Sequence, residues 1–172
     1  VGIGFSTVSV ADGRVYTIGD DGRKSGGHET VYCLDAKTGK PIWAHSYPAP
    51  LIDYLHEGGP CSTPTVDGSI VYALSQHGVL HAFKAKDGTV LWKKEMMKEA
   101  GMKRPPEWGF AASPCLLGDL LLVEAGATFA LDKKTGETKW ESQAYRAAYG
   151  SPSTFKVGNA DLIAVLKTDG LV

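Results

Sequence analysis

The sequence predicts an all-β fold made of repeated four-stranded antiparallel sheets. Three observations lead to this prediction: a turn motif that recurs three times, apolar segments short enough to be strands, and a high glycine content. Glycine accounts for 21 of the 172 residues, against roughly 7% in an average protein. Together with nine prolines, this excess indicates many turns and therefore many short strands.

A ten-residue segment occurs three times along the chain, and such a repeat is the strongest guide to architecture. The copies cover residues 34–43, 83–92 and 131–140. They share a glycine and a final tryptophan: Gly39, Gly88 and Gly136, and Trp43, Trp92 and Trp140. A glycine at this point supplies the positive φ of a tight turn. Each copy is therefore predicted to form a hairpin whose tryptophan packs against a neighbouring unit, a structural docking role.

Two further features recur between these hairpins, a Ser-Pro or Ser-Thr-Pro start and an apolar strand after a glycine turn. They complete units of four predicted strands. The first unit has strands at 5–10, 14–18, 29–35 and 41–46, and the second at 61–66, 70–75, 79–84 and 89–95. The third unit has strands at 110–116, 120–125, 127–132 and 137–142, and a half unit has strands at 149–155 and 161–167. The best helical candidate is the connector segment 94–103.

Four-stranded antiparallel sheets at this repeat length are the blades of a β-propeller. Blades are predicted at 1–46, 59–95 and 109–142, with a half blade at 147–172 and connectors at 47–58 and 96–108. About three and a half blades are fewer than the four to eight of a closed propeller. An open stack exposes an apolar face at each end. We therefore expect closure by further blades or by self-association, and the half-built last unit favours a fragment of a longer parent.

The hairpin motif resembles the tryptophan-docking motif of quinoprotein propellers, Ala-x-Asp-x-x-Thr-Gly-x-x-x-Trp. The third copy matches it in full, through Ala130, Asp132, Thr135, Gly136 and Trp140. The first copy has Cys33 in place of the leading alanine, and the second has Lys84 and Asp87 in place of aspartate and threonine. The resemblance covers essentially the whole chain and implies a propeller similar to those that bind pyrroloquinoline quinone (PQQ).

That superfamily contains proteins of several functions, so the fold does not decide between them. Some members are PQQ- and calcium-dependent alcohol or sugar dehydrogenases. Another is the partner-binding lipoprotein of the outer-membrane β-barrel assembly machine, which has no cofactor. Many others are extracytoplasmic bacterial repeat proteins of unknown role, and the sequence resembles these most. The resemblance implies a periplasmic or otherwise extracytoplasmic location.

The dehydrogenases of this family hold PQQ with a set of residues that the sequence lacks. The set comprises a Cys-Cys disulfide, a Glu/Asn/Asp calcium site, a catalytic aspartate and an arginine. No two cysteines are adjacent, and the single asparagine, Asn159, lies in a predicted turn. The acidic segment 20–22 lacks the ligand spacing of a calcium loop and is expected to be solvated. We therefore expect neither a catalytic residue nor a metal site, and PQQ and calcium enter only under the alternative that the chain is part of a dehydrogenase.

The charge balance excludes other classes of partner. The chain has 18 Lys and Arg and 19 Asp and Glu, a formal charge of −1. It therefore lacks the excess of basic residues that is typical of nucleic-acid-binding proteins. No apolar run approaches the roughly 18 residues of a transmembrane segment.

The connectors carry the polar and aromatic residues that are candidates for binding. In propellers of this kind the first strand of each blade lines the central channel, and the connectors form one rim around its mouth. The candidates at the rim are His56, Glu107, Trp108, Arg146 and Tyr149, with Ser62, Ser113 and Ser151 below them. Such groups around a concave opening are typical of a binding site. The alternative is that the serines bond to neighbouring backbone and Trp108 fills a gap between blades. The leading hypothesis is a non-catalytic binding or scaffold module that contacts a protein or a small ligand.

Overall fold

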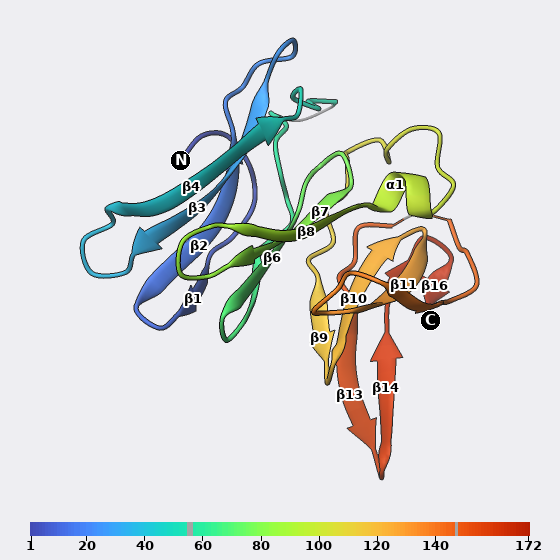
Figure 1. Ribbon diagram of the computed structural model, residues 1–172. Helices are drawn as coiled ribbons and strands as arrows, with labels where there is room; N and C mark the ends of the chain where they lie inside the picture. Colours follow the sequence, from blue (N-terminus) through green and yellow to red (C-terminus); the bar gives the residue numbers. More distant parts are fainter. Residues whose placement is uncertain (55–56, 147) are drawn as a thin grey trace.

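The computed structural model describes residues 1–54, 57–146 and 148–172. The described chain forms three four-stranded antiparallel sheets and then two hairpins (Figure 1). In every four-stranded sheet the strands lie in chain order. The predicted all-β fold of propeller blades is therefore confirmed, with three complete sheets and a partial fourth unit.

The elements have the following bounds. The first sheet contains β1 (Ser9–Ala11), β2 (Arg14–Asp20), β3 (His28–Asp35) and β4 (Pro41–Pro48). The second sheet contains β5 (Thr65–Asp67), β6 (Ile70–Leu74), β7 (Val79–Lys84) and β8 (Val90–Glu95). The third sheet contains β9 (Cys115–Leu117), β10 (Leu120–Ala125), β11 (Ala127–Asp132) and β12 (Thr138–Glu141). The fourth unit contains β13 (Ser153–Val157), β14 (Ala160–Ala164), β15 (Leu166–Lys167) and β16 (Gly170–Leu171).

The first strand of each sheet is shorter than the sequence predicts. β1, β5 and β9 have three residues each, whereas the predicted strands are 5–10, 61–66 and 110–116. Pro64 and Pro114 stand directly before β5 and β9 and have no N–H to donate to a sheet. The predicted helix at 94–103 is also shorter. It consists of α1 (Met96–Glu99), which ends before Gly101 at a φ of +63°.

The repeated turn is held by its aspartate. In the β3–β4 turn, Asp35 Oδ1 accepts hydrogen bonds from the backbone N and the Oγ1 of Thr38, each 2.8 Å long. These bonds stabilise the carboxylate and lower the pKa of Asp35. The next residue, Gly39, has a φ of +68°, a conformation that disfavours residues with a side chain. The turn is therefore held by hydrogen bonds among its own residues.

The tryptophan after each turn connects one sheet to the next. The Trp43 indole N–H donates to the Ala85 carbonyl at 2.9 Å, and a methyl group added to Gly88 would lie 2.8 Å from the Trp43 ring. Trp92 contacts the third sheet in the same two ways. Its indole N–H donates to the Lys133 carbonyl at 3.3 Å, and a methyl group added to Gly136 would lie 2.8 Å from its ring. Glycine at these turns thus leaves room for the ring of the preceding sheet.

The apolar core is divided between successive sheets. One cluster joins the first and second sheets and includes Tyr16, Val31 and Phe83. A second cluster joins the second and third sheets. Its members include Leu74, Leu80, Met96, Phe110, Leu121 and Phe129. Apolar side chains stay exposed near β1 and on the fourth unit, including Val8, Val10, Phe155, Val157 and Leu162.

The acidic segment at 20–22 differs from its prediction at Asp20, which is buried, whereas Asp21 is exposed as expected. The Asp20 side chain is 1% exposed and accepts hydrogen bonds from Gly22 N at 2.7 Å and from Gln76 Nε2 at 3.2 Å. Glu29 lies opposite Asp20 in the β2–β3 ladder and accepts from Gln76 N at 3.0 Å. The second sheet therefore inserts Gln76 against two acidic residues of the first, and burial raises the pKa of Asp20.

The fourth unit is attached to the third sheet by a buried ion pair. Lys167 Nζ lies 2.5 Å from Glu124 Oε2, and both side chains are 1% exposed. Thr128 Oγ1 donates to the same carboxylate at 3.0 Å, and Lys167 also donates to the Gly126 carbonyl at 3.2 Å. Buried charges need such partners, so this pair fixes the position of β15 and β16.

Candidate functional site at the channel mouth

The segments before the first strands lie side by side and are joined by hydroxyl groups. The backbone N of Thr63 donates to Ser113 Oγ, and the backbone N of Ser113 donates to Ser151 Oγ, each at 2.9 Å. The backbone N of Thr7 donates to Thr63 Oγ1 at 3.3 Å. These four residues occupy one repeat position in the four units. They therefore form a continuous row that connects all units.

A second row of hydroxyl groups follows two residues later. Ser9 Oγ donates to the Pro64 carbonyl and Thr65 Oγ1 donates to the Pro114 carbonyl, each at 2.5 Å. The carbonyls of the proline residues thus receive hydrogen bonds from the preceding unit. The short first strands are explained by these rows, because the backbone groups that a longer strand would use are bonded between units instead.

The residues two positions before the first row surround an apolar hollow. Phe5, Cys61, Ala111 and Tyr149 occupy this position in the four units. Together with Trp108 they line a cavity of about 360 Å³. Equivalent residues of all four units thus meet around one opening, which we call the channel mouth after the rim that the sequence predicts. We call this cavity the apolar hollow.

An aromatic pair forms one wall of the hollow. The rings of Trp108 and Tyr149 stack with centroids 5.0 Å apart and an interplanar angle of 26°. The backbone N of Trp108 lies 3.4 Å from the Tyr149 hydroxyl oxygen and donates to it. Trp108 is 40% exposed and comes from the connector after α1, whereas Tyr149 precedes β13. The pair therefore joins two connectors at the mouth.

The position of Trp108 is determined by the residues that follow it. Gly109 N donates to the Pro106 carbonyl at 2.9 Å, and Phe110 N donates to the Gln76 carbonyl at 2.8 Å. The Phe110 side chain is 3% exposed. Gly109 has a φ of +73°, and a methyl group there would lie 2.7 Å from the Gln76 carbonyl oxygen. The chain is thus anchored directly beside an exposed indole ring.

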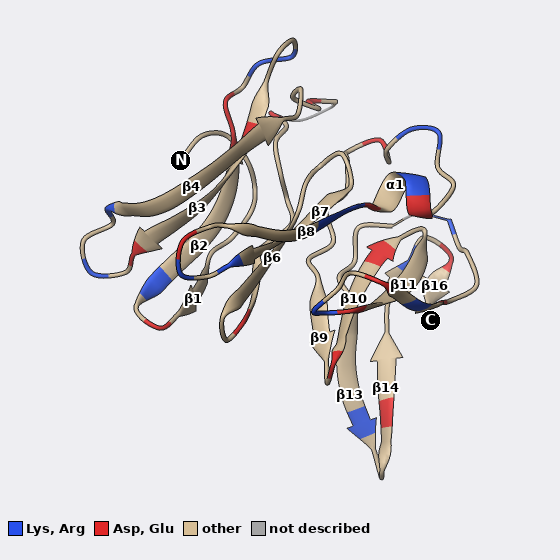
Figure 2. Ribbon diagram, viewed as in Figure 1, with Lys and Arg blue, Asp and Glu red and all other residues tan. Residues whose placement is uncertain are grey.

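A larger groove shares the aromatic pair with the apolar hollow. It has a volume of about 940 Å³ and is also lined by Trp108 and Tyr149. Its charged lining residues are Lys103, Arg104, Glu107 and Arg146. Figure 2 shows basic segments on the loop after α1 and on the connector into the fourth unit. We call this cavity the basic groove, and the aromatic pair is the wall that it shares with the apolar hollow.

The structure brings four of the predicted rim residues together. Glu107, Trp108, Arg146 and Tyr149 line the basic groove. His56 lies outside the described residues. Aligning the Ser-Pro and Thr-Pro positions of the units would have indicated Cys61 and Ala111, which the sequence analysis missed. Phe5 was also missed, because Val8 stands where the other units have proline. Arg104 and Lys103 were also missed, because exposed basic residues in a connector have no distinguishing pattern.

The three predicted serines have different positions. The oxygens of Ser113 and Ser151 accept backbone N–H groups of the preceding unit, so these residues connect units. Ser62 lies one residue before the row, and Thr63 occupies the row position in this unit. Its Oγ is buried and has no hydrogen-bond partner among the described residues.

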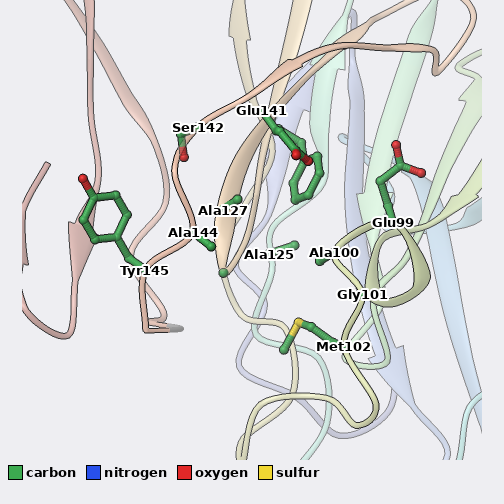
Figure 3. A pocket seen from close by; sticks show the side chains of 12 residues that line it. Glu99, Ala100, Gly101, Met102, Ala125, Ala127, Glu141, Ser142, Ala144 and Tyr145 are labelled. Carbon is green, nitrogen blue, oxygen red and sulfur yellow. The ribbon is translucent and has the colours of Figure 1, made fainter.

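A third cavity lies away from the mouth, between α1 and the third sheet. It has a volume of about 540 Å³, and its lining includes Glu99, Glu141, Met102 and Tyr145 (Figure 3). Glu99 is engaged by Lys94 Nζ at 3.0 Å and by Thr138 Oγ1 at 2.5 Å, and these partners lower its pKa. This carboxylate therefore ties α1 to β12.

The candidate metal ligands of the described residues do not gather in one place. The described residues contain no group of three or more His, Cys, Asp or Glu side chains that could hold a metal ion. The three cysteines are free thiols, and burial raises the pKa of each. These residues do not fit the calcium and disulfide set of a quinone enzyme, so we derive no chemical step through PQQ. Within the described residues no helix is long and apolar enough to cross a membrane.

Comparison with known proteins identifies related sequences and folds. A family model described as "Outer membrane protein assembly factor BamB" matches residues 27–170. A comparison with curated proteins gives no match. Among solved structures, BamB from Moraxella catarrhalis is similar with a TM-score of 0.61 and 20% identity, over 96% of this chain and 47% of that one. The chain thus spans about half the length of that protein.

Two other solved structures are similar in fold. The computationally designed Ika4 protein has a TM-score of 0.62 and 13% identity, over 97% of this chain and 89% of the design. The quinohemoprotein alcohol dehydrogenase of Comamonas testosteroni has a TM-score of 0.61 and 18% identity, over 93% of this chain and 31% of the enzyme. At such identities the likeness concerns the fold alone.

Proposed function

The chain belongs to the family of PQQ-like β-propeller repeats described as outer membrane protein assembly factor BamB, and on that premise we propose that it is a non-catalytic binding or scaffold module. Its channel rim contacts a protein or a small ligand. The family description also supports an extracytoplasmic location, at the periplasmic side of an outer membrane.

The observation that carries the proposal is the aromatic pair at the channel mouth. Trp108 and Tyr149 form a wall that two cavities share, and Trp108 is 40% exposed although its neighbour Phe110 is buried. Aromatic side chains with a polar end are favoured at interfaces. Exposure alone does not separate a binding role from packing, because the docking residue Trp140 is also 39% exposed. The support comes from the position of Trp108, which lines both cavities.

Site-specific photo-crosslinking in the host cell tests the proposal. The crosslinker p-benzoylphenylalanine is placed at the exposed rim residue Glu107, and in a control protein at Lys134, an exposed residue in the β11–β12 turn at the far end of the third sheet. We expect a discrete adduct from position 107 and none from position 134. Trp108→Ala in the position 107 protein should abolish the adduct without lowering the amount of folded protein. Equal labelling from both positions, or an adduct that persists in Trp108→Ala, would contradict the proposed role.

A further inference from the structure

We propose that the rim binds an acidic peptide segment that inserts one large apolar side chain into the apolar hollow. This inference rests on the proposed function and specifies the chemistry of its partner. It follows from the two cavities, which differ in character and share the aromatic pair as a common wall.

The apolar hollow suits a single large side chain. Its lining consists of Phe5, Cys61, Ala111 and the aromatic pair, so it offers a guest mainly aromatic faces and small apolar groups. Its volume of about 360 Å³ is at the lower end of the range of small-molecule pockets, roughly 300–1,000 Å³. Transfer of an apolar side chain from water into such a site is favourable, and stacking on the ring faces adds to it.

The basic groove complements a negatively charged segment. It is lined by three basic residues, Lys103, Arg104 and Arg146, and by one acidic residue, Glu107. None of the three basic side chains forms an ion pair within the part of the chain that the structure describes. Their charge is therefore available to a partner, in a chain whose formal charge is −1. Guanidinium groups bind carboxylates through two parallel hydrogen bonds.

The connector between α1 and β9 has a restricted backbone, which favours binding of an extended ligand. Pro105 and Pro106 restrict its backbone beside Arg104, and the turn from Pro106 to Gly109 is closed by a hydrogen bond. A preordered loop loses little entropy on binding. The basic groove of about 940 Å³ and the apolar hollow share Trp108 and Tyr149 as lining residues, so an extended peptide can contact both cavities where a single small anion contacts one.

Fluorescence anisotropy with a defined peptide tests the inference. The probe is a fluorescein-labelled, C-terminally amidated dodecapeptide of Gly, Glu and Asp with one central Phe, titrated with the protein at low salt. We expect saturable binding. Replacing the Phe of the probe with Ser should weaken binding at least tenfold, and the double variant Arg104→Glu/Arg146→Glu should do the same. The matched control Lys134→Glu reverses an exposed charge far from the rim and should leave binding unchanged.

Three outcomes would overturn the inference: no binding of the acidic probe, equal binding of a probe with Lys in place of Glu and Asp, or tighter binding of a twelve-nucleotide oligothymidine. The last would assign the surface to single-stranded nucleic acid instead. A Trp108-dependent adduct from position 107 without peptide binding would leave the proposed function standing and remove only the acidic-peptide partner. Loss of both signals would remove both.

Discussion

Two regions of the molecule use tryptophan in opposite ways. In the docking belt, defined by Trp43, Trp92 and the facing glycines Gly88 and Gly136, each ring is packed on the turn of the next sheet. At the channel rim, Trp108 is exposed beside Tyr149 and outside the repeat. The belt recurs at the two junctions between the three four-stranded sheets. Trp108 lies outside the repeat, whereas Tyr149 occupies a repeat position, and the proposed binding role rests on their contact with each other.

The largest effect is expected from Trp43→Ala in the docking belt. The ring is 8% exposed, packs on Phe83 with centroids 5.8 Å apart and donates to the Ala85 carbonyl. Its loss should cost about 3–5 kcal/mol of unfolding free energy, measured by urea denaturation. Trp140 is 39% exposed, so Trp140→Ala should cost clearly less in the chain of residues 1–172. Equal costs would show that packing on the next turn contributes little.

A smaller loss of stability is expected from Gly88→Ala in the docking belt, and a still smaller one from Gly39→Ala, where no aromatic ring lies against the glycine. Gly88→Ala forces a side chain into the left-handed region at a φ of +75° and also against the Trp43 ring, for a cost of about 2–4 kcal/mol. Gly39→Ala causes the same kind of backbone strain, at a φ of +68°, but its methyl group has no neighbouring atom within 4 Å. This substitution should cost about 1 kcal/mol. The difference between the two measured costs is the steric part. It should vanish when Gly88→Ala is combined with Trp43→Ala.

The interface between the first and second sheets is predicted to depend on pH. Burial raises the pKa of Glu29 from 4.5 to about 7, so the folded state holds a proton that the unfolded state releases at lower pH. The stability from protonated Glu29 is complete below about pH 4.5 and is lost as the pH rises to about 7. The loss should be about 1–3 kcal/mol. Urea midpoints at pH 5 and pH 8 measure it, and Glu29→Gln should reduce the difference. A higher midpoint at pH 8 would contradict the raised pKa.

The repeat made most of the architecture predictable, because a hairpin turn is built from neighbouring residues. The strands β3, β6 and β11, for example, lie within about one residue of their predicted bounds. What could not be predicted depends on contacts between distant residues. Asp20 is buried because Gln76, from another sheet, bonds to it. The first strands are short because residues 38–56 positions away take their hydrogen bonds.

The candidate site was predictable only in part, for the same reason. Aromatic residues in connectors pointed to Trp108 and Tyr149, but their stacking needs the fourth unit to be placed beside the connector after α1. Ser62 was named from the sequence, whereas Thr63 occupies the position in the hydrogen-bonded row that Ser113 and Ser151 occupy in their units. Phe5 and Cys61 become visible as site residues only when the units are aligned on the hydroxyl row and the position two residues earlier is compared.

The smallest effect on stability is expected at the rim. Tyr149→Phe keeps the stacked ring and removes only the acceptor of the Trp108 N–H, a bond of 3.4 Å. It should change the unfolding free energy by less than about 0.5 kcal/mol. A loss above about 1 kcal/mol would mean that the Tyr149 hydroxyl is part of the packing of the fourth unit. Urea denaturation beside the unmodified protein measures the difference.

The most direct test of the contrast between belt and rim is urea denaturation of Trp108→Ala and Trp43→Ala, measured side by side. The account predicts that Trp108→Ala retains the free energy of unfolding to within about 1 kcal/mol, while Trp43→Ala lowers it by about 3–5 kcal/mol. If Trp108→Ala destabilises the protein as much as Trp43→Ala does, Trp108 is a packing residue between units. The aromatic pair would then no longer support a binding site at the channel mouth.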